Sequence, residues 1–140
     1  MRNNKKPRVV IDTNVWLSGL IFGGQPGRLL KLFADDAILV VISEELLSEL
    51  RRIITRKFPL YVPQLALLEA SLRQDAELVK LGGQTIRVSR DPDDNKVVET
   101  SIIGRCHYII SGDEDLLAID SYRDIRVIKP AEFLQIENLH

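Results

Sequence analysis

Short apolar runs without polar alternation recur along the chain. Each is rich in Val, Ile or Leu, and the runs cover residues 8–11, 38–42, 108–110 and 125–128, with residues 85–88 as a further candidate. Uninterrupted apolar runs of this length are typical of strands that are buried on both faces. The pattern predicts a sheet of about five strands.

The segments between these runs carry helix signals. After Ser43, which suits an N-cap, apolar positions recur at helical spacing to about Lys57, and Pro59 then ends the helix. Further helices are predicted at residues 26–33, 63–82, 96–104 and 113–119 and from Pro130 onward. Strands that alternate with helices predict an α/β fold, a three-layer α/β/α sandwich around a central, mainly parallel sheet.

The length of the chain favours one domain. A chain of 140 residues can bury one sizeable core, so residues 1–140 are interpreted as a single unit whose basic first seven residues are flexible. Cys106 is the only cysteine, which excludes an intrachain disulfide and favours a reducing, cytoplasmic location. No segment approaches the roughly 20 apolar residues that span a bilayer, so no membrane partner is expected.

The overall charge does not favour a polyanionic partner. Nineteen Lys and Arg against twenty Asp and Glu give a net charge of -1. Nucleic acid would therefore have to be bound by local basic patches. The clearest internal patch consists of Arg51, Arg52, Arg56 and Lys57, although a patch of this kind is more often simply solvated surface.

Acidic and polar residues follow the predicted strands. Ligands of parallel sheets bind beyond the carboxyl ends of the strands. Three such ends carry Asp12, Thr13 and Asn14; Asp91, Asp93, Asp94 and Asn95; and Ser111, Gly112 and Asp113. A single Asp after a strand is usually the cap of the next helix. Three acidic strand ends together indicate a shared site.

The helix after Ser43 offers another carboxylate. At 100° per residue, Glu49 lies about 100° from the centre of the apolar stripe, whereas Glu45 lies about 140° away. A carboxylate at the edge of the core can turn into a cleft, so Glu49 is the better candidate.

Clustered carboxylates without imidazole or thiolate ligands favour a hard cation, and Mg²⁺ or Mn²⁺ is the natural expectation. Such sites suit phosphodiester hydrolysis. No serine or cysteine lies in a familiar nucleophile pattern, and neither Gly-Gly pair matches a phosphate-binding loop.

Four segments, VVIDTNVWLSGL, ISEELLSELRRI, DPDDNKVVETS and YIISGDEDLL, resemble the PIN-domain family in their order and spacing. The resemblance covers nearly the whole chain and extends to prokaryotic PIN toxins of toxin-antitoxin pairs, related to the VapC type. It implies a metal-dependent ribonuclease of single-stranded RNA, an antitoxin partner and frequent homodimers.

Carried over residue by residue, the resemblance implies that Asp12, Glu49, Asp94 and Asp113 are catalytic and bind the metal, with Glu49 either ligating or positioning water. The third position stays open among Asp94, Asp91 and Asn95. Asp115 would begin a helix or support the ligands, and Thr13, Asn14 and Ser111 would orient ligands or water by hydrogen bonding. Arg51, Arg52, Arg56 and Lys57 are candidates for phosphate contact.

Three other functions remain open. A structure-specific DNA nuclease would share the fold and the metal. A phospho-acceptor domain would use Lys129 after the last strand, but the acidic pair that it needs after the first strand is missing. A PIN domain that binds RNA or a partner without cutting is the third. Trp16 and Phe22 offer stacking faces, although a core position is the commoner role for such residues.

Overall fold

The computed structural model of the chain describes residues 6–82 and 90–138, and these contain a sheet of six strands. The strands are β1 (Arg8–Ile11), β2 (Leu39–Ser43), β3 (Glu77–Val79), β4 (Tyr108–Ile110), β5 (Ser121–Tyr122) and β6 (Ile125–Ile128). Their order is β3-β2-β1-β4-β6-β5, and β5 alone runs antiparallel to its neighbour. The predicted parallel α/β architecture is confirmed.

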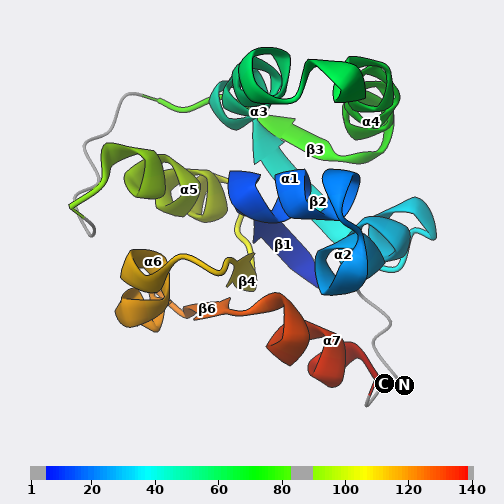
Figure 1. Cartoon of the computed structure of the whole chain (residues 1–140). Helices are drawn as coiled ribbons and strands as arrows, with labels where there is room; N and C mark the ends of the chain where they lie inside the picture. Colours follow the sequence, from blue (N-terminus) through cyan, green and yellow to red (C-terminus); the bar gives the residue numbers. More distant parts are fainter. Residues whose placement is uncertain (1–5, 83–89, 139–140) are drawn as a thin grey trace.

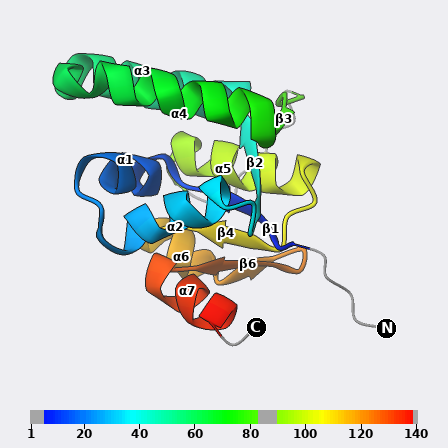
Figure 2. The same ribbon diagram turned by 90° about the vertical axis from the view of Figure 1, so that its right-hand side faces the viewer.

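The helices cover both faces of this sheet. They are α1 (Thr13–Ile21), α2 (Gly24–Ala34), α3 (Glu44–Lys57), the short 3₁₀ helix η1 (Pro59–Tyr61), α4 (Val62–Asp75), α5 (Pro92–Ile103), α6 (Glu114–Ile119) and α7 (Pro130–Asn138). In Figure 1, α1 and α2 lie in front of β1 and β2. Helix α5 packs against β1, β2 and β4. Figure 2 shows α3 and α4 side by side, at the opposite end of the molecule from α7.

The strand order reverses beside β1. From β1 the chain steps outward to β2 and β3, and it then returns to place β4 on the other side of β1. With right-handed crossovers, such a reversal puts the connecting helices on opposite faces and leaves a crevice beyond the carboxyl ends of the two strands. The crevice of this fold therefore lies where β1 and β4 end.

Strand register fixes which residues emerge at this crevice. Ile11 of β1 is aligned with Ile110 of β4, and Ile110 is aligned with Ile128 of β6. All three side chains are at most 2% exposed. Burying an aliphatic side chain of this size contributes about 1.5–3 kcal/mol, so a slip that exposed this row would be costly. The next residues, Asp12 and Ser111, consequently leave the sheet side by side.

The structure corrects several predicted boundaries. The helix predicted over residues 63–82 ends at Asp75, and Glu77–Val79 forms the edge strand β3 beside β2. Helix α5 begins at Pro92 instead of residue 96, because Asp91 caps its amino end. Helix α1 and the two-residue strand β5 were not predicted. The strand predicted at residues 85–88 lies outside the described residues.

No helix within residues 6–82 and 90–138 is both long and apolar enough to cross a membrane. Of the basic first seven residues, Lys6 pairs with Asp36 at 2.6 Å, and the Pro7 carbonyl accepts from the Leu39 amide at 2.9 Å.

Candidate functional site

Asp12 and Ser111 connect the ends of the two strands at the crevice. The Ser111 hydroxyl donates to Oδ2 of Asp12 at 2.7 Å, and the amide of Asp113 donates to Oγ of Ser111 at 2.9 Å. Asp12 is 7% exposed and Ser111 is fully buried. One hydroxyl therefore sets the orientation of the Asp12 carboxylate relative to the turn that follows β4.

Asp113 is held by the helix that it caps. Its Oδ2 accepts from the amide of Leu116 at 3.0 Å, which makes Asp113 the N-cap of α6. Capping restricts the carboxylate to one rotamer and places it against the positive end of the helix dipole. The predicted helix start and the predicted metal ligand are thus the same residue.

Three carboxylates converge beside this cap. One oxygen from each of Asp94, Asp113 and Asp115 lies within 4.8 Å of the corresponding oxygens of the other two. Asp94 is buried on the first turn of α5, whereas Asp91 is exposed and accepts from the amide of Asp93 at 2.9 Å. Asp94 therefore reaches the cluster while Asp91 caps the helix. Asn95 is half-buried on the same turn.

Glu49 approaches the crevice from α3. It is 9% exposed, and its Oε2 accepts from the Thr13 hydroxyl at 2.9 Å. Glu45, one turn earlier, is half-buried and accepts from the Leu81 amide at 3.5 Å. The two glutamates thus face different parts of the structure, and Glu49 lies on the side of β1 and Asp12.

Burial raises the pKa of two of these carboxylates. For Asp12, burial is the main cause, the Ser111 hydrogen bond opposes it, and the charges of Asp113 and Asp91 raise the pKa further. For Glu49, burial again comes first, the Thr13 hydrogen bond and Lys96 oppose it, and Asp93 and Asp12 raise the pKa. These residues therefore share one electrostatic environment in which ionised carboxylates repel each other.

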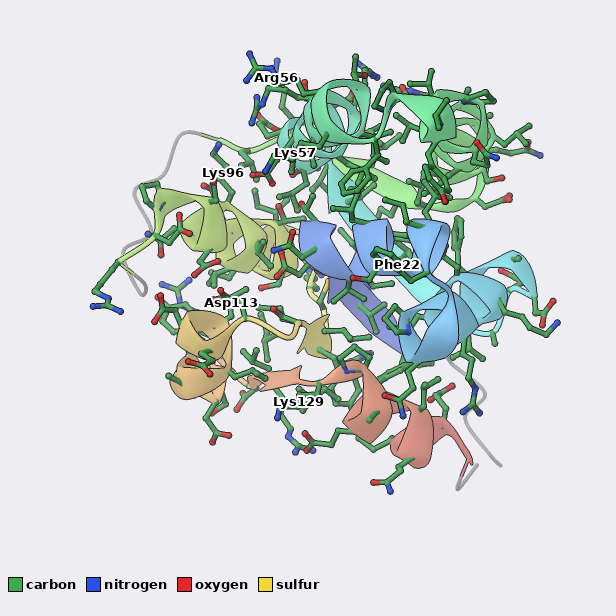
Figure 3. The ribbon with its side chains drawn as sticks, in the orientation of Figure 1. Phe22, Arg56, Lys57, Lys96, Asp113 and Lys129 are labelled. Atoms are coloured by element: carbon green, nitrogen blue, oxygen red, sulfur yellow. The ribbon has the colours of Figure 1, made fainter. Side chains whose placement is uncertain are left out.

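Two cations border the acidic cluster. Arg90 pairs with Asp115 at 3.2 Å, and Lys96 pairs with Asp93 at 3.3 Å. Both pairs are largely exposed, so each stabilises the fold little. Figure 3 shows Lys96, Lys57 and Arg56 on the α3 and α5 side of Asp113.

The basic patch of α3 divides between two faces. Arg51 pairs with Glu69 of α4, and this ion pair raises the pKa of Arg51 and lowers the pKa of Glu69. Arg51 therefore links α3 to α4. Arg52, Arg56 and Lys57 are exposed and form no ion pair among the described residues. At 100° per residue, Arg56 lies within about 20° of Glu49 around the axis and Arg52 within about 60°. These two arginines continue the face that carries Glu49.

The remaining candidates differ in exposure. Asn14 is exposed at the start of α1. Trp16 is 1% exposed and makes an edge contact with Phe33 at 6.1 Å between ring centroids, so it belongs to the core. Phe22 is 78% exposed at the end of α1.

Sequence reasoning missed three features of the site. It gave Asp115 only a supporting place, although its oxygen is in the cluster, and it did not single out Lys96 or Arg90. The i, i+3 spacing of Asp93 and Lys96 was a readable sign of their pairing. The Arg90 contact joins segments 25 residues apart, and no local pattern reports it.

The donor set fits a hard divalent cation. It consists of carboxylate oxygens, with no thiolate and no imidazole among the clustered groups. Oxygen-only sets of this kind suit Mg²⁺, Mn²⁺ or Ca²⁺ better than zinc.

Comparison with known proteins identifies the family of this chain. An uncharacterized protein of Methanocaldococcus jannaschii, MJ1680, is 31% identical over 141 residues, which cover 96% of this chain and 84% of the relative. Residues 8–115 match the family described as PIN domain, whose members are in general nucleases and typically bind a divalent metal. The chain belongs to the PIN domain family.

Proposed function

We propose that this protein is a metal-dependent endoribonuclease that cuts single-stranded RNA. The observation that carries the proposal is the convergence of Asp94, Asp113 and Asp115 beside the buried Asp12, at the crevice where β1 and β4 end. Family membership supports nuclease activity in general. The choice of RNA over DNA is our inference.

The residues proposed to hold Mg²⁺ or Mn²⁺ are Asp94, Asp113 and Asp12, with Asp115 able to replace or join them. Burial and neighbouring carboxylates raise the pKa of Asp12, so positive charge is the expected complement of this site. When bound, the metal would activate water and stabilise the leaving oxygen of a phosphodiester.

The protein groups around these carboxylates have positioning roles in this proposal. Ser111 holds Asp12 in one orientation, and Thr13 does the same for Glu49. Because burial raises its pKa, Glu49 is a better proton acceptor than a solvated glutamate. We assign Glu49 to orienting and deprotonating the attacking water.

The substrate path proposed for RNA follows α3. From Glu49, Arg52 lies one turn and Arg56 two turns further along nearly the same face, about 4.5 and 10.5 Å along the axis. Lys57 extends the exposed charge at the end of the helix. Cations spaced in this way can contact successive phosphates of a single strand. Arg51 is left out of this path because Glu69 binds it.

The test uses end-labelled single-stranded RNA with purified protein in Mg²⁺, in Mn²⁺ or in EDTA. Asp12→Asn removes one carboxylate charge, and Asp75→Asn makes the same change at an exposed position at the end of α4. We expect metal-dependent cleavage that Asp12→Asn abolishes and Asp75→Asn retains.

Other outcomes select among the remaining functions. Equal cleavage by the wild type and Asp12→Asn would indicate a contaminating nuclease and refute the proposal. Cleavage of single-stranded or branched DNA in place of RNA would favour the DNA nuclease. Metal binding without cleavage of either polymer would favour a binding-only PIN domain.

We also propose that the protein acts as the toxin of a toxin-antitoxin pair and forms a homodimer. This proposal rests on the resemblance to the VapC-type toxins, and it is tested by growth on induction with and without the product of the adjacent gene. Growth arrest that the neighbour relieves would support it, and unaffected growth would refute it. Sedimentation of the purified chain tests the dimer.

A further inference from the structure

A pocket of about 670 Å³ adjoins the acidic cluster, and none of its lining residues belongs to α3. One wall is α1, which contributes the exposed Asn14, the half-buried Ser18 and the buried Val15. The opposite wall is the turn between β4 and α6 together with the start of α6. Pro26 of α2 and Pro130 of α7 complete the lining together with Arg90. Cavities of this volume are in the range that receives small organic ligands.

The α1 wall presents unused hydrogen-bonding groups. Within residues 6–82 and 90–138, neither the Asn14 amide nor the Ser18 hydroxyl has a hydrogen-bond partner. The two residues are four apart on the helix, so their side chains lie on one face. An amide offers a donor and an acceptor together, and a hydroxyl can act as either. This is the combination that reads the edge of a nucleobase.

The charge of the opposite wall selects the part of a nucleotide that enters. Asp113, Glu114 and Asp115 all line that wall, and Arg90 is the only cation among the lining residues. A metal held by Asp113 and Asp115 would bind the phosphate that is cut, at the edge of the pocket. Glu114 leaves the rest of this wall unfavourable for a second phosphate, whereas a base carries no charge. Pro26 and Pro130, which are half-buried, supply most of the apolar surface for the faces of such a ring, and Val15 adds only its small exposed part.

We propose that this pocket receives the nucleobase next to the phosphate that is cut, with Asn14 and Ser18 reading its edge. This proposal rests on the proposed nuclease function and adds a base-binding subsite to it. The substrate then spans the site, with its phosphates along Arg52 and Arg56 on one side of the carboxylates and a base beyond them on the other.

Gly112 provides a way to close the pocket. A Cβ built on this residue meets no atom within 4 Å, and its backbone lies outside the positive-φ region. A side chain at this position therefore extends into open space without backbone strain. Ser18→Leu fills the same pocket from the α1 wall. Ser71→Leu is the matched control on the exposed face of α4.

The experiment is a titration of ¹⁵N-labelled protein in EDTA with adenosine, cytidine, uridine and inosine. These uncharged probes test the base alone, and neither metal nor cleavage is involved. We expect at least one nucleoside to shift the amide resonances of Val15, Ser18 and Gly112. Gly112→Leu and Ser18→Leu should each weaken its apparent affinity at least tenfold, and Ser71→Leu should leave it unchanged.

Emission from Trp16, the only tryptophan and a buried one, reports whether each variant has folded. If Gly112→Leu does not fold, Ser18→Leu decides the question. Absence of shifts at these amides with all four nucleosides, or equal affinity in the folded variants, would overturn the subsite. If the nucleosides shift these resonances but the protein cleaves no RNA in the presence of metal, the base-binding subsite is retained and the nuclease function is refuted. Failure of the subsite and failure of the nuclease function are therefore distinguishable.

Discussion

The two ends of strand β1 place charged residues in opposite situations. At the amino end, Arg8 donates through Nε and Nη2 to the Gly104 carbonyl at 2.9 and 2.6 Å, and Nη2 also pairs with Glu77 at 2.7 Å. At the carboxyl end, Asp12 has one hydroxyl partner and faces the charges of other carboxylates. The same strand thus carries a well-paired cation and an anion surrounded by like charge.

The chemistry of the two ends follows from this contrast. Beside Arg8, burial raises the pKa of the Cys106 thiol to about 12, so this thiol is protonated and unreactive at neutral pH. The acidic end instead accumulates repulsion that a cation or proton would relieve. Polar groups that are paired stabilise a fold, whereas groups held in unfavourable surroundings usually serve function at some cost in stability.

The largest expected effect comes from the acidic end. Asp113→Asn removes a cluster charge while keeping a residue that caps helices equally well. We expect the rate of metal-dependent RNA cleavage to fall at least about 100-fold, beyond the 10–100-fold typical of residues that only support metal ligands. The melting temperature should change by no more than about 3 °C. A cleavage rate comparable to that of the wild type would show that Asp113 does not take part in the site.

At the amino end the expected loss is in stability. Arg8→Met leaves the buried Gly104 carbonyl without its guanidinium donors, which costs about 2 kcal/mol. Thermal unfolding followed by circular dichroism should show a melting temperature lower by roughly 6 °C. Cleavage at 20 °C should be unaffected. Arg105→Met is the control, because Arg105 is exposed on the neighbouring turn. An unchanged melting temperature for Arg8→Met would show that the pairing of Arg8 at the amino end of β1 does not stabilise the fold.

The pH dependence of stability should report the acidic end directly. Burial raises the pKa of Asp12 above its ordinary 3.8, so the folded state holds this proton more tightly than the unfolded state. The contribution that protonated Asp12 makes to the free energy of unfolding is then lost as pH rises through the raised pKa.

In EDTA, we therefore expect Asp12→Asn to melt close to wild type at pH 3.5 and roughly 3 °C higher at pH 7. Adding Mg²⁺ at pH 7 should reduce the difference in melting temperature between the two proteins, because the ion stabilises the wild type. An Asp12→Asn protein that is less stable than wild type at pH 7 in EDTA would show that repulsion is not the dominant cost.

The smallest effect distinguishes the two faces of α3. Arg56→Gln should weaken binding of single-stranded RNA and reduce the slope of log affinity against log salt by about 0.7, the amount expected for one lost phosphate contact. Arg51→Gln, whose charge is bound to Glu69, should leave that slope unchanged. Fluorescence anisotropy in EDTA measures both variants without cleavage. Equal slopes for the two would place the RNA elsewhere.

Much of the fold was predictable because buried strands leave a local signature. The runs at β1, β2, β4 and β6 are apolar at nearly every position, and their ends locate the crevice. Helix α1 was missed because its apolar residues do not form one stripe. Val15 and Trp16 are buried, while Leu17 and Leu20 pack partly against other neighbours. Strand β3 was missed because three residues at an edge give too short a pattern.

The candidate site was less accessible to the same reasoning. Strand ends and helix spacing bring Asp12, Asp113 and Glu49 into consideration, and their roles stay predictions. The convergence of Asp115 with Asp94 depends on how α5 and α6 meet, which the sequence does not express. The separation of Arg51 from Arg52 and Arg56, by contrast, was available from helical angles alone.

The alignment of Ile11, Ile110 and Ile128 has an evolutionary consequence. The register of these aliphatic residues sets the position of Asp12 relative to Ser111. A one-residue shift between strands would therefore displace the acidic residues by about 3.3 Å and turn the side chains to the opposite face of the sheet. Selection on the interior and selection on the acids therefore act on the same alignment. Insertions and deletions should be tolerated in the peripheral turns and eliminated from these three strands, whatever the substrate of a given family member.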